Sequence, residues 1–137
     1  MSRAKGRREP FSKAQATARL GYARKCYELG VLGGEEPEDA YAGKVAVTLY
    51  VLAGIASADA ICAARVGERW RGEDHRGAVT LLEEAVPKEQ LGKLLASLLD
   101  IKDKAQYSPA LIRSAEETRA RRVSEQLIAH AATALRG

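Results

Sequence analysis

Arg69 and His75 are the two residues whose types and spacing best fit chemistry on a phosphate. Arginine carries a permanent, planar positive charge that binds phosphate oxygens, and histidine titrates near neutral pH. Five residues separate the two side chains, and Gly72 lies between them. A turn of the backbone at this glycine would bring a cation and an imidazole to the same phosphate. The spacing therefore predicts a site at Arg69 and His75, although it does not by itself predict a function.

The residues around this pair also have structural interpretations. His75 follows Asp74 at an expected helix start, where Asp74 is a natural cap and His75 could serve only as its partner. Trp70 lies between Arg69 and Arg71. Its ring could stack on a base, or it could seal a helical bundle or a contact between two chains. The sequence leaves both interpretations of these residues open.

Two further titratable residues lie in apolar surroundings, and a structural role is favoured for each. Asp59 interrupts a long apolar segment, so we expect its carboxylate to hydrogen-bond a neighbouring helix or to pair with an arginine such as Arg24 or Arg122. His130 lies between two alanines near an apolar stripe and is expected to be a core or rim histidine.

The apolar residues recur at helical spacing, and proline and glycine fall mostly between these periodic segments. We therefore predict helices and no strands. The expected fold class is all-α, an up-and-down bundle of four main helices plus a short helix, formed by residues 11–137 as a single domain. The expected helices cover Ser12 to Gly34, Glu38 to Arg69, Asp74 to Ala85, Pro87 to Tyr107, and a last segment that begins at Ser108 and Pro109.

The basic character of the chain is concentrated at its start. The formal net charge is +4, and the first ten residues carry +3 of it, because four basic residues there face only Glu9. This segment contains almost no apolar residues, so it cannot offset the entropy cost of becoming ordered. Residues 1–10 are therefore expected to form a basic, mobile arm that either touches phosphates or keeps the protein soluble.

The cysteines and the longest apolar run indicate the cellular compartment in which the protein is expected. Cys26 and Cys62 fall in two different expected helices with apolar neighbours, which favours buried free thiols over a disulfide. The run from Val45 to Ala64 approaches the length of a membrane span, but Asp59 and the many alanines favour a buried helix of a soluble bundle. No secretory signal is recognised, so we expect a cytoplasmic protein without membrane contact.

Several classes of site are excluded by spacing. No pair of Glu-x-x-His motifs supports a di-iron centre, and the two cysteines and two histidines are too far apart for a zinc finger. No glycine-rich phosphate loop follows a strand, and no nucleophile elbow is present. We therefore expect neither a metal ion nor a cofactor.

The order of these elements resembles the HEPN superfamily (higher eukaryotes and prokaryotes nucleotide-binding domain), in particular its small bacterial members. The resemblance covers about Ala40 to Leu135. It is carried by the small-residue helix ending near Ala58-Asp59-Ala60, by Asp74-His75 at the next helix start, and by the segment Leu98 to Tyr107 before a final helix rich in alanine, glutamate and arginine.

One short motif adds to this resemblance. In related bacterial members, the segment that ends at the position of Tyr107 often reads Arg-x-x-x-Asp-Tyr. In this chain Lys102 stands in place of the arginine and Gln106 in place of the acid, whereas Tyr107 matches.

The resemblance implies a metal-independent ribonuclease that joins an arginine and a histidine across a homodimer. Cleavage by the ribose 2′-hydroxyl requires a proton acceptor or donor near neutral pH and a fixed cation beside the phosphate. His75 is assigned the first role and Arg69 the second. Five further residues are expected to bind nucleic acid: Arg71, Trp70, Lys102, Lys104 and Tyr107.

The resemblance also implies partners: RNA, a second copy of the chain and a cognate protein, as in a prokaryotic defence or toxin-antitoxin type of system. The alternative is a non-catalytic helical module for binding or oligomerisation. In that case Arg69 and His75 should be held in caps and ion pairs, and the apolar area around Trp70 and Tyr107 should mediate assembly. Asp59 and Asp74 are expected to be structural polar residues in either case.

Overall fold

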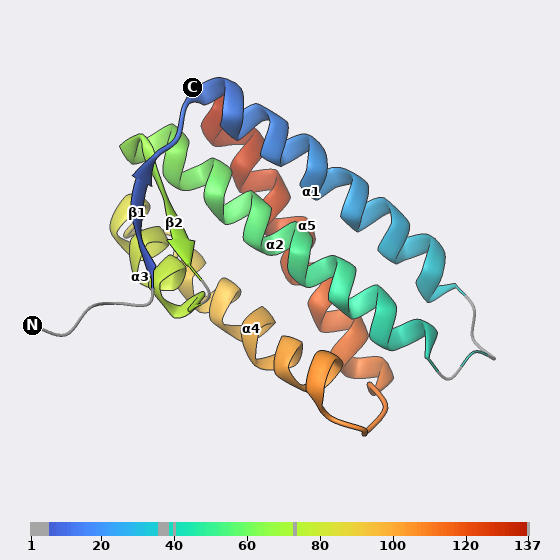
Figure 1. The fold of residues 1–137 in the computed structure, drawn as a ribbon. Helices are drawn as coiled ribbons and strands as arrows, with labels where there is room; N and C mark the ends of the chain where they lie inside the picture. The colour runs from blue at the N-terminus through green and yellow to red at the C-terminus, as the bar shows by residue number, and fades with distance from the viewer. Residues whose placement is uncertain (1–5, 36–38, 40, 73, 137) are drawn as a thin grey trace, which may run out of the picture.

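The protein is mainly helical, as predicted, but it also contains a pair of short strands (Figure 1). The computed structural model describes residues 6–35, 39, 41–72 and 74–136. Its elements in chain order are β1 (Gly6–Pro10), α1 (Lys13–Gly34), α2 (Ala42–Val66), β2 (Glu68–Gly72), α3 (Arg76–Ala85), α4 (Leu91–Tyr107) and α5 (Ser114–Arg136).

The long helices lie side by side, with α2 at the centre. In Figure 1, α1 and α2 run in opposite directions next to each other, α5 lies behind them, and α4 continues the layer on the other side of α2. The helix α2 contacts α1, α3, α4, α5 and β2. Such close packing on every side is consistent with the many alanines and the glycine among its buried residues.

The first helix begins where the sequence predicts. The Ser12 hydroxyl accepts a hydrogen bond from the Gln15 backbone N–H at 3.0 Å, and the Gln15 side chain accepts one from the Ser12 N–H at 2.8 Å. This reciprocal capping box satisfies two backbone donors that the start of a helix otherwise leaves unpaired.

The second helix is shorter than predicted. We expected it to reach Arg69, but it ends at Val66 because Gly67 adopts a left-handed conformation with φ of 72°. The Gly67 N–H still donates to the Ala63 carbonyl at 2.9 Å, which closes the helix. The early end releases Glu68–Gly72 to form a strand.

The prediction that the chain has no strands is wrong, and so is the prediction of a mobile arm for residues 6–10. The strand β1 pairs with β2 in antiparallel register, so that Glu9 lies opposite Arg69. Phe11, which follows β1, is buried, and its N–H donates to the Gly67 carbonyl at 3.0 Å. The buried ring and the strand pairing offset the ordering cost that the composition led us to expect. The rest of the predicted arm, residues 1–5, lies outside the described residues.

The starts of the last two helices also differ from the prediction. The helix α4 begins at Leu91 instead of Pro87, because the chain turns over residues 87–90 and Gln90 has a positive φ of 55°. The helix α5 begins at Ser114 instead of Ser108. The Ser108 hydroxyl accepts a hydrogen bond from the Ala110 N–H at 3.1 Å, so it holds a local turn.

The apolar helix α2 is the one described helix that is long and apolar enough to cross a membrane, and most of its apolar stretch is buried inside the bundle. Length and composition alone do not separate a membrane span from the core helix of a soluble protein. The expected location of the protein therefore stays a prediction.

Cys26 and Cys62 are free and buried, as predicted. Burial raises the pKa of the Cys62 thiol to about 12, and the nearby Asp59 carboxylate adds to this effect. The thiol of Cys62 is therefore protonated at neutral pH and acts as a small apolar side chain.

The central position of α2 leads to a test at Gly54. A Cβ added at Gly54 would clash with Leu98 Cδ1 and would lie 3.4 Å from Leu127 Cδ1. We expect Gly54→Ala to lower the free energy of unfolding by about 1 to 3 kcal/mol, because the core must shift to hold the methyl group. Urea denaturation followed by circular dichroism measures this loss.

Gly21→Ala on α1 is the matched control. Nothing lies within 4 Å of a Cβ at Gly21, so this substitution should raise the stability by up to about 1 kcal/mol through helix propensity. Equal effects of the two substitutions would contradict the tight packing of α2 against α4 and α5.

Candidate functional site

A pocket of about 200 Å³ lies where α2 ends against the two-stranded ribbon formed by β1 and β2. Its walls come from α1, α2, β2 and the start of α3. Four of the residues predicted for catalysis or nucleic-acid binding line it, together with the predicted structural residue Asp59. The full lining is Arg19, Ile55, Asp59, Arg69, Trp70, Arg71, Gly72, His75 and Ala78.

The predicted turn between Arg69 and His75 is present. Gly72 has a φ of 147°, a conformation that side chains other than glycine rarely adopt. The strand therefore ends at this residue, and the chain enters α3 with His75 at the N-cap position. This brings Arg69 and His75 to the same pocket, as their spacing predicted.

Arg69 is held on three sides. Its Nε lies 2.7 Å from Glu9 Oε1, and its Nη1 lies 3.6 Å from Asp59 Oδ2. The guanidinium carbon also lies 4.4 Å from the centre of the Phe11 ring, which is a cation–π distance. The guanidinium is therefore fixed in place by two carboxylates and a ring.

Asp59 is the buried acid at the base of the pocket. Besides Arg69, it accepts hydrogen bonds from Arg19 Nη2 at 3.1 Å and Arg19 Nε at 3.3 Å. Burial nevertheless raises the pKa of Asp59 above its usual range, because the loss of hydration outweighs the two arginines.

The structural role predicted for Asp59 agrees with these contacts, but the predicted partners Arg24 and Arg122 are wrong. Both are exposed, and the ion pairs are made by Arg19 and Arg69. Because α1 and α2 are antiparallel neighbours, the start of α1 lies opposite the end of α2 (Figure 1). This arrangement puts Arg19 beside Asp59.

Arg71 is the least constrained cation of the pocket. Its Nη1 lies 3.7 Å from Glu9 Oε2, and 61% of its side chain is exposed, against 27% for Arg69. A weak, solvent-screened contact of this kind contributes little to stability. Arg71 can therefore turn toward a ligand at low cost.

Trp70 joins the ribbon to α3. Its indole N–H donates to the Asp74 carbonyl at 2.8 Å, and its ring packs against Gly77, where a Cβ would clash with it. The ring is half-buried against the hydrophobic core. Of the two roles considered for Trp70, these contacts agree with sealing of the bundle, although the residue also lines the pocket.

His75 and Asp74 have separate roles at the start of α3. The Asp74 carboxylate accepts a hydrogen bond from the Arg76 N–H at 3.0 Å and so holds the turn before α3, but the N-cap position predicted for Asp74 is taken by His75. The His75 side chain makes no cap bond. Burial lowers the pKa of the imidazole, the Lys102 ammonium lowers it further, and the Asp74 charge opposes the shift. His75 is therefore neutral at pH 7 and can accept a proton.

Lys102 approaches His75 from α4. Both residues line a second pocket of about 190 Å³, together with Asp74, Arg76, Leu99 and Asp103. The imidazole thus lies at the border between the two pockets. Of the three residues of α4 predicted to bind nucleic acid, Lys102 is the one placed beside His75.

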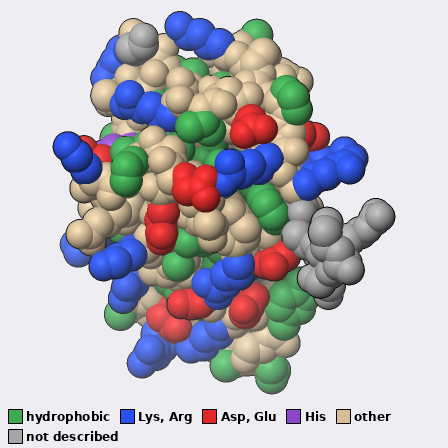
Figure 2. Space-filling view, turned by 90° about the vertical axis from the view of Figure 1, so that its left-hand side faces the viewer, with side chains coloured by type: hydrophobic (Ala, Val, Ile, Leu, Met, Phe, Trp, Pro, Cys, Tyr) green, Lys and Arg blue, Asp and Glu red, His purple; other side chains and the backbone are tan. Residues whose placement is uncertain are grey.

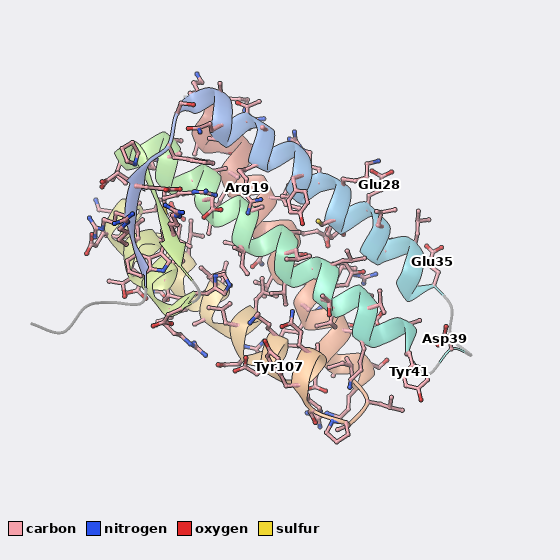
Figure 3. The ribbon with its side chains drawn as sticks, viewed as in Figure 1. Arg19, Glu28, Glu35, Asp39, Tyr41 and Tyr107 are labelled. Atoms are coloured by element: carbon pink, nitrogen blue, oxygen red, sulfur yellow. The ribbon has the colours of Figure 1, made fainter. Side chains whose placement is uncertain are left out.

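The structure does not bring Lys104 and Tyr107 to this site. Lys104 Nζ pairs with Glu116 Oε1 at 2.8 Å, and this bond helps to lower the pKa of Glu116 to about 2. Tyr107 is exposed at the end of α4, and Figure 3 shows it well away from Arg19. Two residues beyond Lys102 the helix has turned by about 200°, so Lys104 faces another direction.

Sequence reasoning missed Arg19, Glu9 and Phe11 as parts of this site. Arg19 could have been found from the expected antiparallel packing of the first two helices. In that packing, early residues of the first helix, such as Arg19, lie beside late residues of the second, such as Asp59. Glu9 and Phe11 gave no local signal, because their roles depend on the pairing of β1 with a strand that is almost sixty residues away.

Comparisons of the chain with protein-family models, with curated proteins and with solved structures found no match. Among the residues that the structure describes, no group of three or more His, Cys, Asp or Glu side chains could hold a metal ion. The polar groups that the pocket presents are three guanidinium groups, the Asp59 carboxylate, the Trp70 indole and the His75 imidazole.

The placement of Lys102 beside His75 in one pocket predicts a measurable titration. We expect His75 to titrate below its usual pKa of 6.5, and we expect Lys102→Gln to raise this pKa without restoring it fully, because burial is the larger cause. The imidazole proton resonances, followed by NMR across the acid range, measure both values. Lys93→Gln, a charge change at the other end of α4, is the control.

The shift also sets the sign of a stability change. The folded chain binds fewer protons at His75 than the unfolded chain does between the lowered pKa and 6.5. The contribution of His75 to the free energy of unfolding is therefore full above pH 6.5 and is lost as the pH falls through the folded pKa. A His75 pKa above 6.5 would contradict the observed placement of Lys102.

Proposed function

We propose that this protein is a metal-independent endoribonuclease that acts at the pocket between the ribbon and α3. The observation that carries the proposal is the convergence of a neutral, half-buried imidazole with three arginines in one small pocket. A proton acceptor beside fixed cations is what attack by a ribose 2′-hydroxyl requires.

In this mechanism His75 removes the proton from the 2′-hydroxyl. The 2′-oxygen attacks phosphorus, the bond to the 5′-oxygen breaks, and that oxygen takes a proton from solvent, leaving a 2′,3′-cyclic phosphate and a 5′-hydroxyl. The guanidinium groups stabilise the negative charge that grows on the phosphate oxygens during the attack. Because Arg69 is already fixed, it needs little reorganisation to act in this way.

The charges of the pocket suit one phosphodiester. Arg19, Arg69 and Arg71 contribute three positive charges, and the carboxylates of Asp59 and Glu9 contribute two negative ones. One positive charge remains when His75 is neutral, and a phosphodiester group carries one negative charge. Among the three cations, Arg71 is the best phosphate ligand because it is exposed and loosely held.

We further propose that the fold is the up-and-down bundle of four main helices typical of HEPN-like proteins. The long helices α1, α2, α4 and α5 reverse direction one after another in Figure 1, which supports this assignment. The proposed setting is the prokaryotic cytoplasm, in a defence or toxin-antitoxin type of system with a cognate protein.

We also propose a homodimer. It is supported by large apolar side chains that are exposed on a single chain and that a second copy could cover. Tyr107 is 74% exposed, Tyr41 is 69% exposed, and several aliphatic side chains are also open to solvent: Leu29, Leu32, Val45, Val66 and Leu111.

A non-catalytic binding module is the second candidate, and the contacts of Arg69 favour it. The guanidinium already has two carboxylate partners, and the Trp70 N–H is used by the Asp74 carbonyl. This is the locked arrangement expected if these side chains only support the fold.

RNA cleavage in the presence of EDTA separates the two candidates. We expect the wild type to cut a labelled mixed RNA, and we expect His75→Ala to lower the rate by about 100- to 10,000-fold, since it removes the proton acceptor. Arg69→Ala should also abolish cleavage. His130→Ala changes the other histidine, which lines a separate pocket, and should cleave like the wild type.

Circular dichroism must show that all variants are folded, because Arg69→Ala removes a partner of a buried acid. Arg71→Gln, at an exposed side chain, is a second cation variant that should fold normally and cleave slowly. No cleavage by the wild type, or equal cleavage by wild type and His75→Ala, would reject the nuclease and leave the binding module.

A further inference from the structure

The ribbon places an acid where a phosphate would bind. Arg69 and Arg71 are two residues apart on β2, so their side chains leave the same face of the strand. Glu9 lies opposite Arg69 on β1, on that same face. Its two carboxylate oxygens reach different arginines, Oε1 to Arg69 at 2.7 Å and Oε2 toward Arg71 at 3.7 Å.

Guanidinium groups bind carboxylates and phosphates in much the same geometry, through N–H donors directed at a pair of oxygens. The Glu9 carboxylate therefore makes the contacts that two phosphate oxygens would make. The register also puts Arg7 opposite Arg71, which adds a third cation to this face of the ribbon. Three arginines thus share this face of the ribbon with one acid.

We propose that the ribbon is a binding site for the phosphodiester backbone of single-stranded RNA, and that Glu9 occupies this site as a built-in competitor. This inference rests on the proposed function for the identity of the ligand. The RNA phosphate replaces the Glu9 carboxylate between Arg69 and Arg71, and the carboxylate turns out to solvent.

The exchange requires only a side-chain rotation. β1 remains anchored by Phe11, which is buried, and by the ion pair between Arg8 and Glu84 of α3. Arg69 also keeps Asp59 as a partner when Glu9 leaves. Figure 2 looks onto this end of the molecule and shows Lys and Arg side chains scattered over it, with acidic side chains between them.

Glu9 makes the site selective for ligands with more than one phosphate. A single phosphate makes favourable contacts at one position only, and to do so it must displace an acid that is already attached to the protein. A chain of phosphodiesters also meets neighbouring cations such as Arg7, and these contacts offset the loss of the Glu9 pairs.

The test is the affinity for a short oligouridylate with 2′-O-methyl riboses, a probe that cannot be cleaved through the 2′-hydroxyl. We expect Glu9→Gln in the full chain to bind this probe about five-fold more tightly at low salt, because a competing charge is removed from contact distance. The slope of log affinity against log salt should steepen by about 0.7, the value for one more phosphate neutralised on a single strand.

Glu84→Gln is the matched control. It removes the same charge and also breaks an ion pair to β1, but the partner of Glu84 is Arg8, which alternates to the other face of β1 from Glu9. Its affinity for the probe should stay within about two-fold of the wild type, because Glu84 pairs with Arg8 and does not compete for Arg69 and Arg71. Equal gains in Glu9→Gln and Glu84→Gln would overturn the proposal.

Arg71→Gln alone keeps the test decisive if Glu9→Gln does not fold, and a double-mutant cycle of the two extends it when both variants fold. Arg71→Gln alone should weaken binding of the probe, and the gain from Glu9→Gln should disappear in the double variant. Unchanged affinity of Arg71→Gln would overturn the site on the ribbon. Tight binding without cleavage of unmodified RNA would instead reject the nuclease and retain the site.

Discussion

The burial of the Asp59 carboxylate is the constraint on which the site depends. An ionised acid taken out of water costs several kcal/mol unless it is paired. Asp59 lies near the end of the central helix and obtains its partners from two other elements, Arg19 of α1 and Arg69 of β2. Through Arg69 the network reaches Glu9, so one buried charge ties together α1, α2 and both strands.

The same network serves stability and the proposed chemistry, and the two uses compete. Ion pairs that fix Arg69 prepare it to stabilise charge on a phosphate, yet they also neutralise part of the charge that would attract one. The two uses are compatible because the cations of the pocket are held to different degrees. Arg69 is fixed at the base, whereas Arg71 is exposed and reaches Glu9 only at 3.7 Å.

The position of His75 depends on packing as well as on its neighbours in sequence. Gly72 turns the chain after β2, and Trp70 packs on Gly77 and donates to the Asp74 carbonyl. These contacts fix the start of α3, and α4 then brings Lys102 toward the imidazole. Partial burial and this cation keep His75 neutral, a property that neither its sequence spacing nor its cap position would provide.

The sequence by itself determined the features that depend on near neighbours. Helical periodicity predicted five helical segments, Ser12 and Gln15 form the cap that their types favour, and Gly72 allows the turn that unites Arg69 with His75. Only the tertiary structure decided the pairing of β1 with β2, the partners of Asp59, and the separation of Lys104 and Tyr107 from the pocket. Strand pairing and buried ion pairs join residues that are distant in the chain, so their free energy depends on the packed fold and leaves no local pattern in the sequence.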